Sequence, residues 1–449
     1  MPLEETKKRM DEKSISIEIF GLGYVGFPLS VRLASANFNI IGIDVNQERI
    51  KRLENDELMD SELHLEKEYN ICRQKNNIKF QTIPKKSIQP KIGIICVPTP
   101  IPTNNVKSDI FVKTAVNSFL QNAKFGDIII LESSVEVGTT DKIKDIVESK
   151  GFQIGKDFGL CFCPERIDPS NKEWGIENIP RIIYCSDDTS FEIAKKIYNN
   201  VNQGNLLRVS SSKIAEIVKS FENTFRLVNI ALVNELAILC DKLDVNVKEI
   251  IDAAATKPFG FMPHYPGAGA GGHCIPKDPR FLLESAKVNG INFNTIEHSL
   301  KINEFMPKYI ANVIDGKTQS LSLEKSILIC GLSYKANVED MRDSPSFKII
   351  KEMNNLGFKV YGYDPFFNKD FLQKYLIENH LDKFSCEIVQ NLNNLTDKIS
   401  CLCIVQHHEY DKEEITKIYE SGKIPIIYDC QSKLKVNACS KSKLIYLGD

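Results

Sequence analysis

The sequence has no basic excess, because its 57 Lys and Arg residues are balanced by 59 Asp and Glu residues. A protein that neutralises a phosphate backbone needs surplus cationic side chains, so the balance argues against nucleic acid as a partner. Long apolar runs are also lacking: none approaches the roughly 18 residues of a membrane span. The charged residues 1–9 contain no apolar core of a signal peptide. We therefore expect a cytoplasmic protein that spans no membrane.

The sequence also lacks a disulfide framework and a metal-binding motif. Its 13 cysteines are odd in number, and most lie among strand-like apolar residues. Cys161 and Cys163, like Cys401 and Cys403, alternate along a strand, without a second pair or a histidine at zinc-finger spacing. We interpret them as reduced, buried residues and expect no metal.

At 449 residues the chain is long enough for two or three domains. Residues 14–207 alternate helix-length stretches with six apolar runs: Ile15–Phe20, Ile40–Ile43, Ile92–Val97, Asp127–Leu131, Gly159–Cys163 and Ile182–Cys185. This alternation predicts an α/β fold with a doubly wound parallel sheet. A long helix is expected to start near Ser212, because apolar residues recur from there at steps of three and four and neither Pro nor Gly interrupts them until well beyond Leu243.

A third region repeats the order of the first. Gly21-Leu-Gly-Tyr24 and Gly331-Leu-Ser-Tyr334 each follow a predicted strand, and Asp44 and Asp364 each close the next one. Ser333 replaces the second glycine, which in a dinucleotide fold lets the backbone approach the pyrophosphate. We expect a second Rossmann-like sheet that does not hold a dinucleotide in the same way. The predicted layout is a charged N-terminal tail (1–13), a first sheet domain (14–207), a central helical domain (208–310) and a second sheet domain (311–449).

The first glycine turn predicts NAD binding. Gly21, Gly23 and Gly26 follow a predicted strand and open a helix, which is the context of a dinucleotide fingerprint. Asp44 ends the next strand, where its carboxylate can accept hydrogen bonds from ribose hydroxyls and repel a 2′-phosphate. NAD is thus favoured over NADP. The alternative is a glycine turn that binds nothing.

The segment 267–278 is the most informative in the chain. Several glycines directly before Cys274 indicate a backbone that passes close to a ligand and a thiol exposed in a pocket. Asp278 would share a face with Cys274 if the chain is helical here. The alternative is a buried cysteine after a flexible loop.

A polar stripe marks the predicted long helix. Lys219, Asn223 and Arg226 lie at positions i, i+4 and i+7. A solvated face explains such spacing equally well. The functional interpretation is a buried lysine that stabilises an alkoxide beside an Asn that orients water.

Seven motifs together resemble the UDP-glucose/GDP-mannose dehydrogenase family. They are Gly21-Leu-Gly-Tyr-Val-Gly26, Val97-Pro-Thr-Pro100, Glu132-Ser-Ser-Val135 with Gly138-Thr-Thr140, Pro164-Glu-Arg166, Lys219-x-x-Glu-Asn223, Gly271-Gly-His-Cys-Ile-Pro276, and Tyr334-Lys335 with Asp340-Met-Arg342. The resemblance implies two Rossmann-like domains joined by a helical domain through which two chains dimerise. It places NAD on the first domain and a UDP-sugar with the third.

The resemblance also implies residue roles. Cys274 would be the nucleophile and Asp278 would help in proton transfer. Lys219 and Asn223 would stabilise oxyanions, and Glu165 would assist hydrolysis through water, with Ser134 completing the catalytic set. The implied cofactor contacts are Gly21, Gly23, Tyr24, Val25, Gly26, Asp44, Arg49, Pro98, Thr99, Ser134 and Arg342. The implied substrate contacts are Glu165, Arg166, Lys219, Asn223, Arg226, Tyr265, Gly267, Gly271 and Lys335.

The implied reaction oxidises the sugar C6 alcohol to the acid in two hydride transfers, through a thiohemiacetal and a thioester on Cys274, with two NAD consumed. Pro169 stands where the UDP-glucose enzymes carry a second Glu, and Tyr265-Pro-Gly267 precedes the glycine loop. Both features are more similar to UDP-N-acetylglucosamine and UDP-N-acetylmannosamine dehydrogenases. We therefore expect a UDP-N-acetylhexosamine as substrate, with UDP-glucose as the alternative. The segment Asp429-Cys-Gln-Ser432 lacks the Arg usual after this Asp.

Two other functions fit parts of the sequence. A single-step β-hydroxyacid dehydrogenase shares the Rossmann domain, the long helix and a catalytic lysine, but has no need of Cys274. A non-catalytic regulator that binds NAD or a nucleotide sugar has no need of Lys219, Asn223 and Cys274. The presence of all three favours the enzyme.

Overall fold

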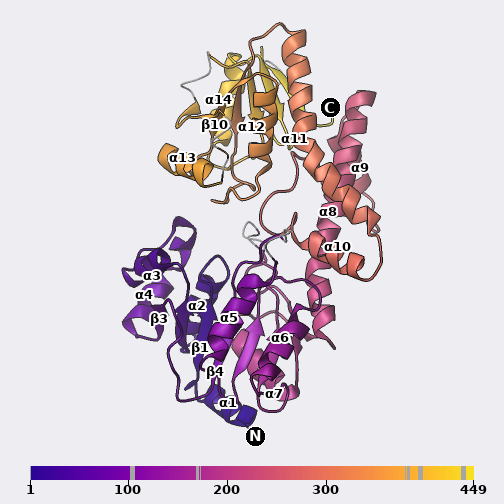
Figure 1. Cartoon of the computed structure of the whole chain (residues 1–449). Helices are drawn as coiled ribbons and strands as arrows, with labels where there is room; N and C mark the ends of the chain where they lie inside the picture. The colour runs from indigo at the N-terminus through magenta and orange to yellow at the C-terminus, as the bar shows by residue number, and fades with distance from the viewer. Residues whose placement is uncertain are drawn as a thin grey trace. The chain divides into compact units, whose positions relative to one another are not determined.

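The structure is a computed structural model that describes residues 2–101, 107–167, 171, 173–379, 381, 385–392, 398–435 and 441–449. It contains two compact units. Unit 1 comprises Met1–Glu222 and Arg280–Gly290, and unit 2 comprises Asn223–Pro279 and Ile291–Asp449. Each unit contains its own sheet (Figure 1).

The sheet of unit 1 has eight strands in the order β3-β2-β1-β4-β5-β6-β7-β8. The strands are β1 (Ser16–Phe20), β2 (Asn39–Ile43), β3 (Ile78–Gln81), β4 (Lys91–Ile95), β5 (Ile128–Leu131), β6 (Gly159–Phe162), β7 (Arg181–Cys185) and β8 (Leu206–Arg208). The first six have the order of a Rossmann sheet.

The prediction of a wholly parallel first sheet is wrong at β7, which runs antiparallel to β6. A parallel neighbour requires a crossover, usually a helix. The residues described between β6 and β7 contain no helix, so the chain turns back beside β6. Strands β3 and β8 were not among the predicted runs, because Ile78–Gln81 and Leu206–Arg208 are short and partly polar.

Helices cover both faces of this sheet. They are α1 (Pro2–Asp11), α2 (Gly26–Ser35), α3 (Gln47–Glu54), the short η1 (Asp60–Leu65), α4 (Glu66–Gln74), α5 (Ile110–Leu120), α6 (Thr139–Ser149) and α7 (Asp188–Asn199). One apolar layer joins β1 to α2, α4 and α7, and the other joins β4 and β5 to α5 and α6. Side chains alternate across each strand, so a doubly wound sheet requires both layers.

The segment expected as a charged N-terminal tail is helix α1, and it is part of unit 1. Leu3 and Met10 are buried in the core, and Thr6 Oγ1 donates a hydrogen bond to the Gly126 carbonyl at 2.6 Å. The charged residues of α1 therefore form the outer face of an amphipathic helix.

The long helix is confirmed as α8 (Ser212–Leu243). Near its start, Glu216 accepts hydrogen bonds from the backbone N–H groups of Gly138 (2.6 Å) and Thr140 (2.8 Å). These donors are the N-cap residue and the buried first turn of α6, so a carboxylate from α8 caps a second helix. Of the helices in the described residues, only α8 is long and apolar enough to cross a membrane, a test that core helices also pass.

Unit 2 contains a second, fully parallel sheet in the order β11-β10-β9-β12-β13-β14. Its strands are β9 (Ser326–Cys330), β10 (Lys359–Tyr363), β11 (Glu387–Ile388), β12 (Cys401–Ile404), β13 (Ile426–Asp429) and β14 (Lys443–Tyr446). The helices that follow α8 are α9 (Val247–Ala255), α10 (Asp278–Val288), α11 (Asn294–Ser320), α12 (Pro345–Asn355), α13 (Lys369–Glu378) and α14 (Lys412–Ser421). The predicted fold of two Rossmann-like sheets and a central helical region is confirmed.

Candidate active site

The glycine turn after β1 has room for a ligand at one position. A Cβ on Gly21 would lie 2.8 Å from the Cys96 carbonyl oxygen, and a Cβ on Gly26 only 1.9 Å from the Gly21 carbonyl oxygen. Gly21 also has φ +89°, in the left-handed region that favours glycine. Beside Gly23, by contrast, nothing lies within 4 Å. Two glycines are thus required for packing, and the open side of Gly23 fits a dinucleotide pyrophosphate.

Asp44 is joined to this turn. Its Oδ2 accepts a hydrogen bond from the Leu22 N–H at 2.8 Å, and its Oδ1 accepts one from the Asn46 N–H at 2.9 Å. The carboxylate is half-buried at the end of β2, so it retains acceptor capacity for a ribose. Arg49 donates to the Leu22 carbonyl at 3.1 Å and pairs with Glu62. Arg49 therefore supports the turn, and its contact with a cofactor stays a prediction.

The loops after β4 and β5 lie at the same sheet edge as the glycine turn, because the strands are parallel. Ser133 Oγ donates to the Val97 carbonyl at 2.6 Å and so ties the two loops together. Of the other predicted cofactor residues here, Thr99 is buried, Ser134 and Val25 are half-buried, and Pro98 and Tyr24 are exposed. The carboxyl edge of a doubly wound sheet is where ligands bind.

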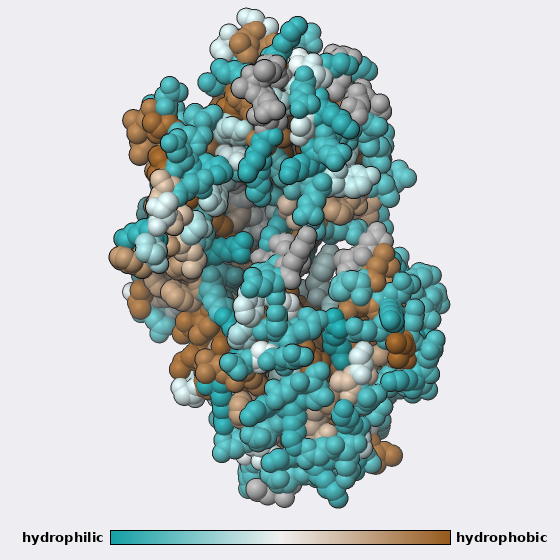
Figure 2. Space-filling model, turned by 180° about the vertical axis from the view of Figure 1, so that it is seen from behind, coloured by the Kyte–Doolittle hydropathy of each residue, from teal (hydrophilic) through white to brown (hydrophobic). Residues whose placement is uncertain are grey.

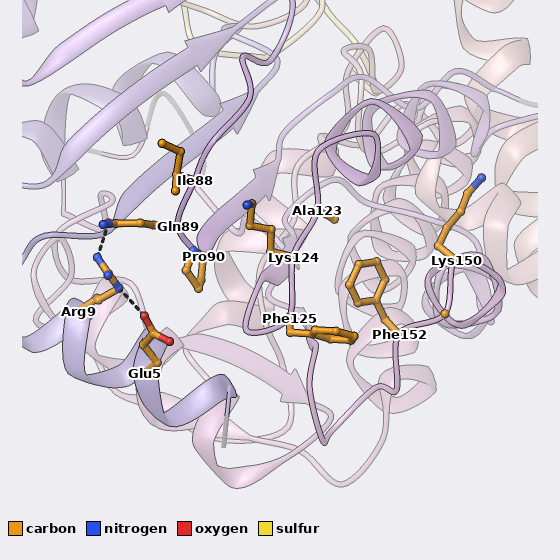
Figure 3. A pocket seen from close by; sticks show the side chains of 11 residues that line it. Glu5, Arg9, Ile88, Gln89, Pro90, Ala123, Lys124, Phe125, Lys150 and Phe152 are labelled. Atoms are coloured by element: carbon orange, nitrogen blue, oxygen red, sulfur yellow. Dashed lines mark hydrogen bonds and ion pairs between the residues drawn. The ribbon is translucent and has the colours of Figure 1, made fainter.

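A hollow of about 650 Å³ lies elsewhere in unit 1. Its lining includes residues 88–90, which precede β4, and residues 123–125, which precede β5 (Figure 3). These segments are at the amino ends of the strands. The hollow is therefore separate from the predicted cofactor site.

Glu165 follows β6, and both oxygens of its carboxylate have partners within unit 1. Oε1 accepts the backbone N–H groups of Arg166 (2.6 Å) and Ile167 (2.8 Å), and Oε2 pairs with Arg181. Arg166 is itself paired with Glu222 on α8, with Nε 3.1 Å from the carboxylate. Sequence reasoning missed Arg181, although an arginine that opens the apolar run of β7 was a visible signal.

Lys219 on α8 belongs to unit 1 and is only 8 % exposed. A lysine this largely buried on the helix fits a group that meets a ligand. Glu222, one turn further along, is the partner of Arg166. The solvated-face alternative for this stripe is therefore wrong at Lys219, whereas Arg226 on the same helix is exposed.

Cys274 in unit 2 is the single exposed cysteine among the twelve that the structure describes, and nine of the others are buried. The paired strand cysteines, such as Cys161 and Cys403, are 0 % exposed, as interpreted from the sequence. The described residues contain no group of three His, Cys, Asp or Glu side chains arranged for a metal ion. The alternative of a buried Cys274 is wrong.

Asp278 begins α10, so Cys274 lies in the preceding turn and not on the helix. The expected helical face shared by the two side chains is therefore not formed. Instead, the Cys274 carbonyl accepts the N–H of Asp278 at 2.9 Å. The Asp278 side chain is fully buried, and its Oδ2 accepts a hydrogen bond from Asn223 Nδ2 at 2.6 Å. The structure thus joins two predicted catalytic residues through a direct contact.

The glycines before Cys274 pack against their own chain. A Cβ on Gly271 would lie 2.7 Å from the Asp343 carbonyl oxygen, and one on Gly272 would lie 2.6 Å from the Tyr334 ring. Gly269 has φ +117° and approaches the Asn303 carbonyl in the same way. The close approach predicted for a ligand is thus, at these three positions, an approach to unit 2 itself.

His273, next to Cys274, is held in its neutral form. Its Nδ1 lies 3.1 Å from Lys277 Nζ. Burial, and then the charges of Lys277 and Arg342, lower the pKa of His273 from 6.5 to about 3. The neutral ring can accept a hydrogen bond from the ammonium, which fixes Lys277 close to the cysteine loop.

We expect this histidine to make unit 2 sensitive to acid. Below pH 6.5 the unfolded chain protonates His273 and the folded chain does not, so stability is lost as the pH falls towards 3. The loss between pH 6.5 and 5 should be about 2 kcal/mol. Between pH 6.5 and 5, the urea midpoint of the His273→Gln protein should fall less than that of the wild type. His298→Gln, at an exposed position, is the matched control, and equal acid sensitivity of His273→Gln and the wild type would contradict the assignment.

The turn after β9 explains why the second sheet differs from the first. Asp364 Oδ2 accepts hydrogen bonds from the Leu332 N–H (2.8 Å), the Ser333 N–H (2.8 Å) and Ser333 Oγ (2.7 Å). The carboxylate is 3 % exposed and lies 3.3 Å from His408 Nε2. It is occupied by its own chain, so it is not available to a ribose as Asp44 is.

The remaining predicted residues are also divided between the units. Unit 1 contains the glycine turn, Ser134, Glu165, Arg166 and Lys219. Unit 2 contains Asn223, Arg226, Tyr265, Gly267, Gly271, Cys274, Asp278, Lys335 and Arg342. Tyr265 donates to Asp252 at 2.6 Å, Arg342 pairs with Asp340 at 2.6 Å, and Lys335 is half-buried. Pro169 lies outside the described residues.

Comparison with known proteins agrees with this geometry. Three models of the UDP-glucose/GDP-mannose dehydrogenase family match the chain: the NAD binding domain at residues 15–202, the central domain at 213–305 and the UDP binding domain at 328–436. The UDP-N-acetyl-D-mannosamine dehydrogenase of Methanococcus vannielii is 33 % identical over 98 % of this chain and 99 % of its own. The UDP-N-acetyl-D-glucosamine 6-dehydrogenase of Salmonella typhi is 31 % identical over 80 % of this chain and 84 % of its own.

A similar structure has also been solved. The UDP-N-acetyl-mannosamine dehydrogenase of Staphylococcus aureus has a TM-score of 0.82 at 29 % identity, over 96 % of this chain and 98 % of that one. All three family domains are matched, in the family's order. The chain is therefore a member of the UDP-glucose/GDP-mannose dehydrogenase family.

Proposed function

We propose that this protein is an NAD-dependent UDP-sugar 6-dehydrogenase that oxidises a UDP-N-acetylhexosamine to the corresponding uronate. Cys274, which alone among the twelve described cysteines is exposed, carries the proposal, because a four-electron oxidation of this kind needs a nucleophile. The relatives named for UDP-N-acetylmannosamine and UDP-N-acetylglucosamine favour these two sugars over UDP-glucose. We further propose the layout of a cofactor segment (14–207), a central segment (208–310) and a UDP-sugar segment (311–449).

The residues of unit 1 fit NAD, which accepts hydride when it is bound. Gly23 leaves space for the pyrophosphate, and Asp44 offers carboxylate oxygens to the ribose. Lys219 is a buried cation, so it can stabilise the oxyanion that forms as the C6 alcohol loses a proton.

The residues of unit 2 provide the covalent step. An aldehyde cannot lose a second hydride until a nucleophile makes its carbon tetrahedral, so the Cys274 thiolate adds to C6 and forms a thiohemiacetal. Loss of hydride from that carbon gives a thioester, and water then opens it, with the C–S bond breaking and the sulfur leaving as thiolate. Asn223 and the Asp278 carboxylate form a hydrogen-bonded pair that can orient water and transfer protons.

The two alternative functions account for less of the structure. A single-step β-hydroxyacid dehydrogenase gives no role to an exposed cysteine beside a buried Asp–Asn pair. A regulator that only binds ligands gives no role to the buried Lys219. Both features have a function in the four-electron oxidation.

Substrate specificity is tested by offering UDP-N-acetylmannosamine, UDP-N-acetylglucosamine and UDP-glucose separately with NAD. We expect one of the two N-acetylhexosamines to give the uronate, detected by mass spectrometry, at least about tenfold faster than UDP-glucose, a difference of ~1.4 kcal/mol. Faster oxidation of UDP-glucose would contradict the proposed substrate. Absence of NADH formation with all three would support the regulator.

We also propose that two copies pair through α8. Seven apolar side chains on this helix are between 41 and 62 % exposed: Ile214, Ile217, Phe221, Phe225, Leu232, Leu239 and Leu243. Their steps of three, four and seven residues place them along one side of the helix. Apolar surface gathers along the side of the molecule on which α8 runs, at the left edge of Figure 2.

Charged residues among these exposed apolar side chains of α8 should separate the two copies. Leu232→Glu combined with Leu239→Glu is expected to convert a dimer to a monomer in light scattering, because a dimer would bury both carboxylates. Glu235→Gln on the same helix is a control for the charge of α8. A doubly substituted protein that stays dimeric would show that another surface holds the copies together.

The proposed setting is the cytoplasm, where NAD and nucleotide sugars are available and thiols stay reduced. None of the twelve described cysteines forms a disulfide, and a reactive Cys274 requires that reduced state. The uronate that forms would serve the synthesis of a polysaccharide.

A further inference from the structure

Arg181 is a fully buried arginine between two carboxylates of unit 1. Its side chain is 1 % exposed. One guanidinium nitrogen lies 3.2 Å from Glu132 Oε1, and the other pairs with Glu165 Oε2. Glu132 is fully buried and also accepts a hydrogen bond from Tyr198 at 2.6 Å. The cluster therefore contains two carboxylates and one cation.

The reversed strand β7 brings Arg181 to this place. In the antiparallel pair, Cys161 faces Cys185 and Phe162 faces Tyr184. Continuing that register sets Glu165 opposite Arg181, the first residue of β7. Were β7 parallel to β6, its first residue would lie at the amino edge of the sheet, away from the proposed chemistry. The one antiparallel pair among the described strands thus delivers a cation to the carboxyl edge.

Stability alone does not account for the cluster. Replacing a buried ion pair with apolar residues is often neutral or stabilising. Here Arg181 Nε and Glu132 Oε2 are buried without a hydrogen-bond partner in the described structure, which adds cost. Burial raises the pKa of Glu132, against the opposing effect of Arg181. A buried charge cluster that leaves polar atoms unsatisfied marks a candidate functional site.

We propose that Arg181 is a positioning residue that keeps Glu165 charged and oriented so that it can take the proton of the water that opens the Cys274 thioester. The inference rests on the proposed function. In that step water forms the new C–O bond, the C–S bond breaks with its electron pair on sulfur, and the proton passes to Glu165. Glu132 shares the same cation, so the cluster also links Glu165 to the loop that carries Ser133 and Ser134.

Without Arg181, the fully buried Glu132 and the largely buried Glu165 would share a proton, because no cation would lie between the two carboxylates. A protonated Glu165 cannot accept the proton of water, so hydrolysis should slow at neutral pH and recover in alkali. The other charged or titratable groups around the cluster are Cys96, Cys163, Arg166, Tyr198 and Glu222.

The test follows the thioester on Cys274 by intact mass during a single turnover between pH 6 and 9. In Arg181→Met the adduct should accumulate, with hydrolysis at pH 7 slowed about tenfold or more and rising up to tenfold per pH unit. Arg181→Lys, which keeps the charge, should restore most of the rate. Adding Glu132→Gln to Arg181→Met should restore part of it, because the competing carboxylate is gone.

Lys91→Met is the matched control, since Lys91 is 1 % exposed and forms a buried pair with Glu18 at 2.8 Å at the other edge of the same sheet. It should lose stability without accumulating thioester, and an Arg181→Met protein that behaves like it overturns the inference. If Arg181→Met does not fold, the Glu132→Gln protein provides the test. Its thioester hydrolysis should stay fast to a lower pH than that of the wild type, and an unchanged pH profile overturns the inference. A wild type that forms neither NADH nor an adduct on Cys274 refutes the proposed function instead.

Discussion

Cys274→Ala is expected to lower uronate formation by about three orders of magnitude or more. The substitution removes the sulfur that makes the aldehyde carbon tetrahedral, so the second hydride has no carbon from which to leave. The Cys274 side chain is exposed before α10, so the loss should come without a fall in stability. The measurement is uronate by mass spectrometry beside a urea unfolding curve.

Cys386→Ala provides the control, because Cys386 is half-buried in the second sheet domain and has no proposed part in the reaction. It should retain the wild-type rate. An active Cys274→Ala protein that forms the acid at the wild-type rate would refute covalent catalysis. That result would favour the single-step dehydrogenase.

Gly23→Val is expected to weaken NAD binding by about 100-fold, because the new side chain would fill the space where the pyrophosphate approaches the backbone. Nothing in the protein lies within 4 Å of a Cβ at this position, so the fold itself should tolerate the change. Fluorescence titration with NADH measures the affinity, and thermal unfolding without ligand measures the stability.

Gly26→Ala gives the opposite pattern and serves as the comparison. Its Cβ would lie 1.9 Å from the Gly21 carbonyl oxygen, so the turn itself must shift and the protein should be destabilised. If Gly23→Val instead unfolds the protein and Gly26→Ala does not, the pyrophosphate does not lie along Gly23.

The sequence was most informative where a local pattern determines the structure. Alternating apolar runs identified six strands of the first sheet, and the spacing of apolar residues from Ser212 to Leu243 identified α8. The replacement of a glycine by Ser333 correctly indicated a second sheet that differs from the first, because the Ser333 hydroxyl donates a hydrogen bond to the Asp364 carboxylate.

Features that depend on distant contacts were not accessible from the sequence. The reversal of β7 goes with the lack of a crossover helix among the residues described between β6 and β7, and short strands such as β8 carry too weak a pattern. Arg181 was missed because its partners, Glu132 and Glu165, come from other strand ends. The glycines before Cys274 were assigned to a ligand, whereas contacts with Tyr334, Asp343 and Asn303 require three of them.

The most direct test of the account counts NADH released per UDP-sugar consumed. With limiting UDP-N-acetylhexosamine and excess NAD, absorbance at the end point gives the ratio, and mass spectrometry identifies the product. The proposed mechanism predicts two NADH for each uronate, because alcohol and thiohemiacetal each lose one hydride. A ratio of one, with the aldehyde as product, would contradict the four-electron oxidation and the role of Cys274 in it.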